Sequence, residues 1–120
     1  MTEYIFDTYA IIEIIRGNPN YKPYLDEGII INDFIFSELC YNLIKIDYPK
    51  KEYYLEKYEE FISQVDPEII KEAMQFSYKN KKKKMSMTDC VSYVMAKELE
   101  IKFLTGDKEF ERLNNVEFVK

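Results

Sequence analysis

Two aspartates stand where two short apolar strands are expected to end. Asp7 directly follows the run Tyr4–Phe6, and Asp107 comes shortly after the run Lys102–Leu104. In an open parallel sheet the carboxyl ends of the strands share one edge, and ligands bind there. We therefore predict that these two carboxylates lie close together, although about a hundred residues separate them in the sequence.

A third carboxylate, Asp89, is placed by a helix. Ser86 is a good N-cap for a helix from Met87 to about Glu100, which puts Asp89 in the first turn. Ser92 and Ala96 share the face of Asp89 at positions i+3 and i+7. These small side chains are expected to let the helix approach the sheet and bring Asp89 inward.

Glu38 completes the acidic group, one turn into the helix expected after the second strand. Four carboxylates that converge repel one another strongly unless cations lie between them. Two divalent ions about 4 Å apart can activate a water and stabilise a leaving oxygen in phosphoryl chemistry. The pattern predicts an Mg²⁺ or Mn²⁺ site whose ligands are Asp7, Glu38, Asp89 and Asp107.

Each of these acids also has an ordinary structural interpretation. Asp7 and Asp107 can cap the helices that follow them. Asp89 would be stabilised by the helix dipole in a first turn. Glu38 can be a surface residue with Lys45 on roughly the same face. All four interpretations stay open from the residues alone.

The composition limits the chemistry further. The chain has 120 residues, of which 47% are hydrophobic and 32% charged, so we expect a single globular domain spanning residues 1–120. The absence of histidine excludes Ser-His and Cys-His nucleophilic machinery and most zinc chemistry. Cys40 and Cys90 each lie in an apolar-periodic segment and are expected to be free thiols.

No membrane association is expected. No apolar run is long enough for a transmembrane helix, and the first residues are not typical of a signal peptide. We therefore expect a cytoplasmic protein. The net charge of −5 is unusual for a protein that binds nucleic acid, although five lysines are concentrated between Lys79 and Lys84.

Strand and helix patterns alternate along the chain. We predict strands at 4–6, 29–31, 102–104 and 116–119, with a short edge strand at 62–65. Helices are predicted at 8–16, 21–26, 34–47, 51–61, 67–79, 87–100 and 108–113. This order favours an α/β fold, a three-layer α/β/α sandwich around a mainly parallel sheet of about four or five strands. Ile35, Leu39, Leu43 and Ile46 form the expected apolar stripe of the 34–47 helix.

Four segments, in this order and spacing, resemble the PIN domain family. They are Phe6-Asp7-Thr8, Ser37-Glu38-Leu39, Thr88-Asp89-Cys90 and the stretch Leu104–Phe110. The resemblance extends from Tyr4 to about Val119, and the compact size is similar to the VapC-type toxins of toxin–antitoxin pairs.

The resemblance implies a metal-dependent endoribonuclease that hydrolyses RNA with metal-activated water and forms no covalent enzyme intermediate. It further implies that Asp7, Glu38, Asp89 and Asp107 are catalytic and bind Mg²⁺ or Mn²⁺. Thr105 would orient the last carboxylate or a metal-bound water, and Thr8 would support Asp7. A cognate antitoxin that enters the active-site groove, and a homodimer, are the partners implied.

Several alternatives remain. The chain can be a PIN-fold nuclease of RNA processing or DNA repair, or a non-catalytic domain that only binds a partner. A receiver-like phospho-acceptor domain is disfavoured, because Glu3 and Asp7 supply its paired acids poorly.

The lysines from Lys79 to Lys84 form either a solvated loop or phosphate contacts. Tyr48, Tyr53, Tyr54 and Tyr58 either stack on bases or pack between helices, and the 51–61 helix is the expected partner surface.

Overall fold

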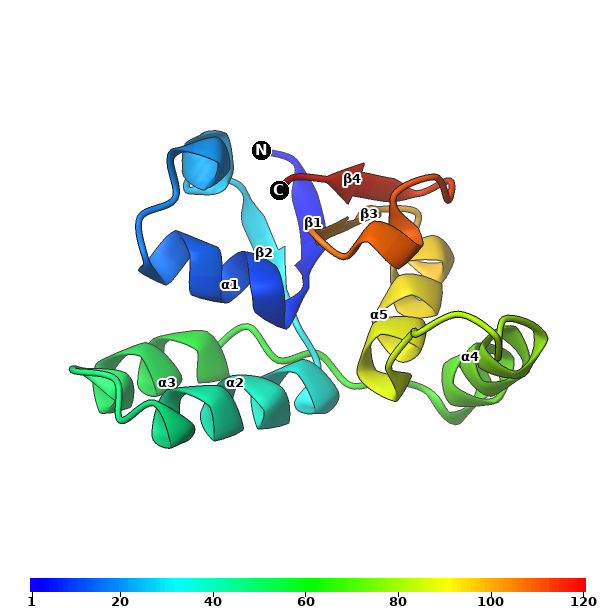
Figure 1. The fold of residues 1–120 in the computed structure, drawn as a ribbon, viewed down its shortest axis with the longest axis horizontal. Helices are drawn as coiled ribbons and strands as arrows, with labels where there is room; N and C mark the ends of the chain where they lie inside the picture. The colour runs from blue at the N-terminus through cyan, green and yellow to red at the C-terminus, as the bar shows by residue number, and fades with distance from the viewer.

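A four-stranded parallel sheet lies at the centre of the computed structural model, which describes all 120 residues (Figure 1). The strand order is β2 (Gly28–Ile30), β1 (Glu3–Phe6), β3 (Lys102–Thr105) and β4 (Val116–Phe118). The predicted edge strand at 62–65 is reduced to one bridge between Ile62 and Ile31. After Ser63, whose N–H donates to the Ile31 carbonyl, the chain leaves the sheet edge.

Helices cover both faces of this sheet, which confirms the predicted three-layer α/β/α arrangement. α1 (Thr8–Ile15) and α5 (Met87–Glu98) pack against β1 and β3, and Figure 1 shows them on opposite sides. α4 (Pro67–Lys79) packs on α5, whereas α2 (Asp33–Lys45) pairs with α3 (Lys51–Glu59). Two short 3₁₀ segments, η1 (Pro19–Tyr24) and η2 (Lys108–Phe110), complete the chain.

The helix α5 is almost entirely inside the protein, which explains its small residues. Ser92 and Ala96 have no exposed surface, as predicted for side chains that let the helix approach the sheet. The Ser86 hydroxyl accepts a hydrogen bond from the Asp89 N–H at 3.0 Å, so the predicted cap is present. The buried Asn32 amide donates to the Ser92 hydroxyl at 3.2 Å and joins α5 to the start of α2. The Ser86 cap fixes where α5 begins, and the Asn32 contact holds the helix against the start of α2.

Some helical segments also differ from the sequence-based expectation. The predicted helix 108–113 is only the 3₁₀ segment η2 (Lys108–Phe110). The first 3₁₀ segment begins at Pro19, because Asn18 caps it through the Asn20 N–H and proline tolerates a first position that needs no donor. Helix α2 ends at Lys45, so Ile46 follows the helix and is 48% exposed. The prediction that Ile46 belongs to the apolar stripe was therefore wrong, while Ile35, Leu39 and Leu43 are buried as predicted.

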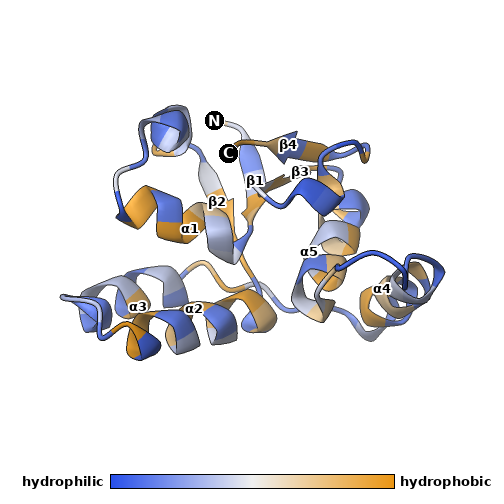
Figure 2. Ribbon diagram, viewed as in Figure 1, coloured by the Kyte–Doolittle hydropathy of each residue, from blue (hydrophilic) through white to orange (hydrophobic).

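The thiols agree with the sequence-based expectation. Cys40 and Cys90 are both free, as predicted. None of the helices has the length and apolar character that a membrane crossing needs. Figure 2 shows the loop between α4 and α5, together with η2, in the blue of hydrophilic residues.

Candidate active site

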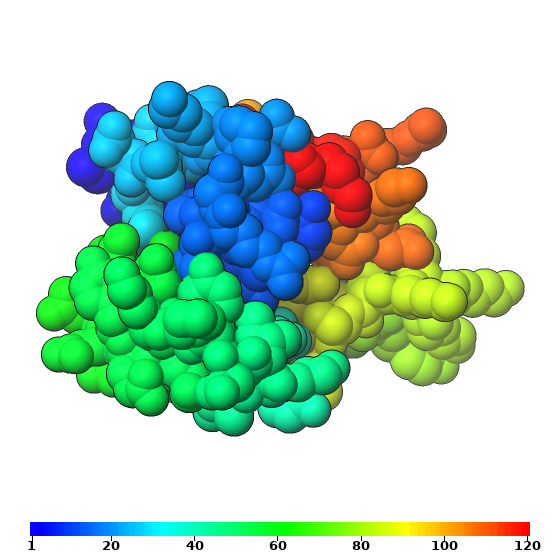
Figure 3. All heavy atoms as spheres, turned by 60° about the vertical axis from the view of Figure 1, so that its left-hand side comes forward, coloured from blue at the N-terminus to red at the C-terminus, as the bar shows by residue number.

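The four predicted acidic residues line one open cavity of about 560 Å³. It lies at the carboxyl ends of β1 and β3, where Asp7 and Asp107 were expected to meet. Figure 3 shows the segments around it meeting on one face: α1 in blue, the chain end in red, η2 in orange and the start of α5 in yellow. The other lining residues are Thr8, Tyr9, Ile12, Asn42, Gly106, Lys108 and Lys120.

Asp7 is the buried centre of the cavity. Its N–H donates to the Leu104 carbonyl at 3.0 Å, which ties the end of β1 to β3. Its carboxylate does not cap α1, so the ordinary interpretation of this residue is wrong. Instead, the Thr105 hydroxyl donates to the Asp7 Oδ2 at 2.7 Å. A side chain buried at the end of a strand is thus oriented from the neighbouring strand.

Asp89 lies beside Asp7 in an environment that disfavours its ionised form. Burial raises the pKa of Asp89 to about 9, with further contributions from the charge of Asp7, a hydrogen bond to Asp7, and the charges of Asp107 and Glu38. Burial also raises the pKa of Asp7, although hydrogen bonds from Thr105 and Asp89 oppose the shift. A proton on the Asp89 carboxyl would relieve the repulsion between the two groups.

Glu38 and Asp107 are half-buried at the edge of this pair. The Thr8 hydroxyl donates to the Glu38 Oε1 at 3.0 Å. Thr8 was expected to support Asp7, but it supports Glu38 instead. No ion pair joins Glu38 to Lys45. Asp107 accepts a hydrogen bond from the Glu109 N–H at 3.0 Å and therefore does cap η2.

Thr105 has a different contact from the one expected. It was expected to orient the last carboxylate or a metal-bound water, whereas its buried hydroxyl donates to Asp7 and accepts from the Asp107 N–H at 3.1 Å. It therefore aligns one carboxylate directly and the other through the backbone. This single hydroxyl couples the ends of β1 and β3.

The donor set suits a hard cation, but the side chains do not surround one. All four acids offer carboxylate oxygens, the ligands that Mg²⁺ and Mn²⁺ prefer. No three acidic, histidine or cysteine side chains converge closely enough to hold an ion as they stand. Glu38 and Asp107 each accept a hydrogen bond from a neighbouring donor in this arrangement. The buried acidic pair is nevertheless an environment that a cation would relieve.

Replacing Thr105 with valine should disturb this site without changing its volume much. The substitution removes the Thr105 donor from the Asp7 carboxylate and leaves the Asp107 N–H without its acceptor. We expect a loss of about 1–3 kcal/mol in the free energy of unfolding. If the site is catalytic, activity should fall about 10- to 100-fold, as for other groups that orient a metal ligand. Denaturant titration measures the first effect, with the exposed Thr2→Val as control; unchanged stability would contradict it.

Four further polar side chains in the cavity were not found from the sequence: those of Tyr9, Asn42, Lys108 and Lys120. Asn42 lies one helical turn after Glu38 and donates to the Glu38 carbonyl at 2.9 Å. Its i+4 spacing from Glu38 is the one signal that was present in the sequence. Nothing in the local pattern places Lys120 there, because long-range contacts with Thr105 and Asn20 hold this end of the chain.

The lysine and tyrosine segments lie at the surface to different degrees. The lysines between Lys79 and Lys84 are all exposed, and Lys81 lies over the ring of Tyr78 at 4.1 Å. Tyr58 is buried, while Tyr53 is 61% exposed and packs edge-on against Tyr54. Helix packing thus accounts for Tyr58 but leaves one aromatic ring on the surface of α3.

The fold is shared with several solved structures. A chain of a toxin–antitoxin complex from Klebsiella pneumoniae aligns with a TM-score of 0.78 at 17% identity, covering 95% of both chains. The sarcin-ricin loop cleaving toxin VapC20 of Mycobacterium tuberculosis gives 0.77 at 11% identity, covering 99% of this chain and 100% of that one. A chain of VapBC2 from Rickettsia felis, solved with a promoter DNA fragment, gives 0.71 at 19%, with 99% and 100% covered. These likenesses concern the fold.

The sequence gives a more specific result. No curated protein sequence matches this chain. The sequence profile of the PIN domain, however, matches residues 4–116, which is nearly the whole chain and includes all four acids of the cavity. The chain therefore belongs to the PIN domain family.

Proposed function

We propose that this protein is a metal-dependent endoribonuclease, and that it is the toxin of a toxin–antitoxin pair. The observation that carries the proposal is the buried Asp7–Asp89 pair in an open cavity. Two carboxyls forced together at the expense of stability are typical of a functional site rather than of a structural one. We expect the protein to act in the cytoplasm as a single domain that forms homodimers.

We assign different roles to the residues of the cavity. Asp7, Glu38, Asp89 and Asp107 would hold Mg²⁺ or Mn²⁺, with Thr105 and Thr8 orienting the Asp7 and Glu38 carboxylates. When bound, the cation supplies an activated water and neutralises charge on the phosphate. Asp89 would lose its proton when a cation is bound. Asp107 would still cap η2 with one carboxylate oxygen, which leaves the other oxygen for the cation.

The toxin assignment rests on the structural relatives. Two of them come from toxin–antitoxin complexes and a third is a toxin that cleaves the sarcin-ricin loop. We propose a cognate antitoxin whose basic side chains enter the acidic cavity. A gene for such a protein beside this one would support the proposal.

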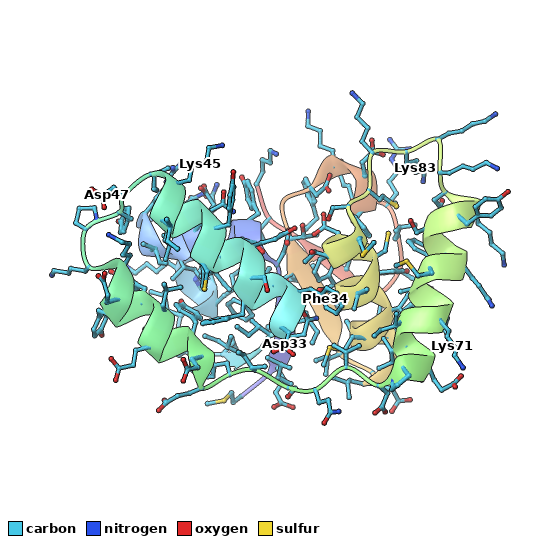
Figure 4. All side chains as sticks on the ribbon, turned by 90° about the horizontal axis from the view of Figure 1, so that it is seen from below. Asp33, Phe34, Lys45, Asp47, Lys71 and Lys83 are labelled. Carbon is cyan, nitrogen blue, oxygen red and sulfur yellow. The ribbon has the colours of Figure 1, made fainter.

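RNA binding by an acidic chain requires locally concentrated positive charge. Figure 4 shows Lys83 and Lys45 extending from the same side of the molecule, with Lys83 in the loop that leads to α5. That loop precedes the helix of Asp89 and carries exposed lysines. We propose that these lysines contact RNA phosphates, so that affinity falls as salt rises.

Cleavage of single-stranded RNA tests the proposal. We expect the wild-type protein to cut it in Mg²⁺ or Mn²⁺ and to lose all cutting in EDTA. Cleavage of DNA but not RNA would indicate a repair nuclease, and a preference for one processed transcript would indicate RNA processing. If no nucleic acid is cut in any metal, and Mn²⁺ does not raise the melting temperature, the domain is a non-catalytic binding module.

A further inference from the structure

Lys120 is fixed on the rim of the acidic cavity by contacts from several parts of the chain. The Val119 N–H donates to the Thr105 carbonyl at 3.0 Å, and the buried Tyr21 hydroxyl donates to the Val119 carbonyl at 2.5 Å. The Asn20 amide donates to the Lys120 carbonyl at 3.0 Å. Figure 3 shows the red chain end between the blue α1 segment and the orange η2 segment. The backbone of Lys120 is therefore held beside the site.

The Lys120 side chain is also held, but not by an acid. Its ammonium donates to the Gly106 carbonyl at 3.0 Å and lies 5.2 Å from the centre of the Tyr9 ring. None of the ion pairs in the protein includes Lys120, although four carboxylates line the same cavity. An ammonium has three donors, and one is used here. Two N–H groups and a full positive charge remain available to an anion.

The shape of the chain around Gly106 preserves this arrangement. A Cβ atom at position 106 would overlap the Cε1 atom of Tyr9, at a separation closer than real contacts allow. Any side chain at position 106 would push away the ring over which Lys120 lies. Glycine at position 106 thus permits the Tyr9 ring to support the Lys120 ammonium.

Lys108 offers a contrast within the same cavity. Both lysines of the lining are exposed, but Lys108 makes no side-chain hydrogen bond or ion pair. A mobile lysine loses conformational entropy when it binds a ligand, whereas a lysine that is already held loses less. Lys120 is therefore the cation of the cavity that is organised for binding.

We propose that Lys120 is a phosphate-binding residue, which holds the backbone of the RNA strand at the mouth of the acidic cavity. The inference rests on the proposed function, since it names how that site takes its substrate. Lys120 acts here as a substrate-positioning residue. Its charge offsets part of the repulsion between the phosphates and the acids.

Equilibrium binding of a fluorescent single-stranded RNA tests this, with Ca²⁺ as the cation and the RNA checked for integrity afterwards. We expect Lys120→Met to bind about 10-fold more weakly, the effect of losing one charged hydrogen bond. The slope of log K against log salt should fall by about 0.7, which corresponds to one phosphate contact on a single strand. Lys120→Arg should bind within about threefold of wild type, because the guanidinium also pairs with phosphate.

Lys71→Met is the matched control, because it removes the same charge from an exposed position at the other end of α4 from Lys83 (Figure 4). Its affinity and salt slope should match those of wild type. Equal affinity and salt slope in Lys120→Met and wild type would overturn the inference, and so would a wild type that binds no RNA.

Cleavage in Mn²⁺, measured in parallel, separates the two proposals. Wild-type cleavage with no effect of Lys120→Met on binding overturns the phosphate site alone. Binding that depends on Lys120 without any cleavage supports the phosphate site and overturns the ribonuclease.

Discussion

Replacing Asp89 with asparagine is expected to abolish metal-dependent RNA cleavage and, at the same time, to stabilise the metal-free protein. The asparagine would keep the volume of the side chain and can donate its amide to Asp7, as the protonated Asp89 does. It cannot supply an anionic oxygen to a cation. Groups that merely orient a metal ligand contribute about 10- to 100-fold. We therefore expect a loss of at least about 100-fold in kcat/KM.

The gain in stability follows from the electrostatics of the site. The pKa of Asp89 is raised from 3.8 to about 9, so ionising it in the folded protein at neutral pH is unfavourable. An amide removes that penalty, and we expect the free energy of unfolding in EDTA at pH 7.5 to rise on the order of 1–3 kcal/mol. For a domain of this size the melting temperature should increase by roughly 4–12 °C.

The control for this variant is Asp33→Asn. Asp33 also lies in the first turn of a helix, but it is exposed and outside the cavity. Its replacement should leave cleavage unchanged and should not stabilise the protein. An Asp89→Asn protein that cuts RNA like the wild type would eliminate Asp89 from the metal site. One that is inactive because it is unfolded would contradict the electrostatic argument.

The position of the acids was predictable because it follows from strand and helix ends. A short apolar run that stops at an aspartate gives the end of a strand, and parallel strands share that edge. Asp7 and Asp107 were placed together on this basis alone. The close packing of α5 on the sheet was equally predictable, since the small side chains of Ser92 and Ala96 lie on one face of the helix. These features are local in sequence, so periodicity and composition reveal them.

The partners of the acids were not predictable for the opposite reason. Thr105 and Asp7 lie 98 residues apart, as do Tyr21 and Val119, and Asn20 and Lys120 lie 100 apart. Such pairs depend on how β3, β4 and η1 are arranged around β1, and no periodicity encodes that arrangement. Thr8 illustrates the limit, because the helix start was placed correctly while its hydroxyl contacts Glu38 on another helix.

Removing metal should make the stability of this protein depend steeply on pH, and adding metal should reverse the effect. The chain has no histidine, so no side chain with an ordinary pKa has its titration midpoint between about pH 5.5 and 8. Asp89 is different, because its folded-state pKa is raised to about 9. Within this window the folded protein retains a proton that the unfolded chain has already released. Its free energy of unfolding must therefore fall as pH rises, by up to about 1.4 kcal/mol per pH unit.

Denaturant titrations in EDTA at pH 5.5 and pH 8 measure this dependence. We expect wild type to lose on the order of 2 kcal/mol between them, and Asp89→Asn to lose much less. Equal midpoints for wild type at the two pH values would show that no carboxyl in the cavity is shifted. Any pH dependence common to both proteins reports the general repulsion within an acidic chain, and it cancels in the difference.

Mn²⁺ should stabilise the protein most at pH 8, where the metal-free protein is least stable. A cation in the proposed site would bind the ionised carboxylates, so it would compete with the proton on Asp89 and its affinity would rise with pH. At pH 8, Mn²⁺ at 100 times its Kd should raise the free energy of unfolding by about 2.7 kcal/mol. At pH 5.5 the same concentration should do far less, and Asp89→Asn should respond weakly at both. A Tm shift of equal size at both pH values would place the ion away from the Asp7–Asp89 pair. Only an ion that displaces the proton of this pair would stabilise the protein in a pH-dependent way.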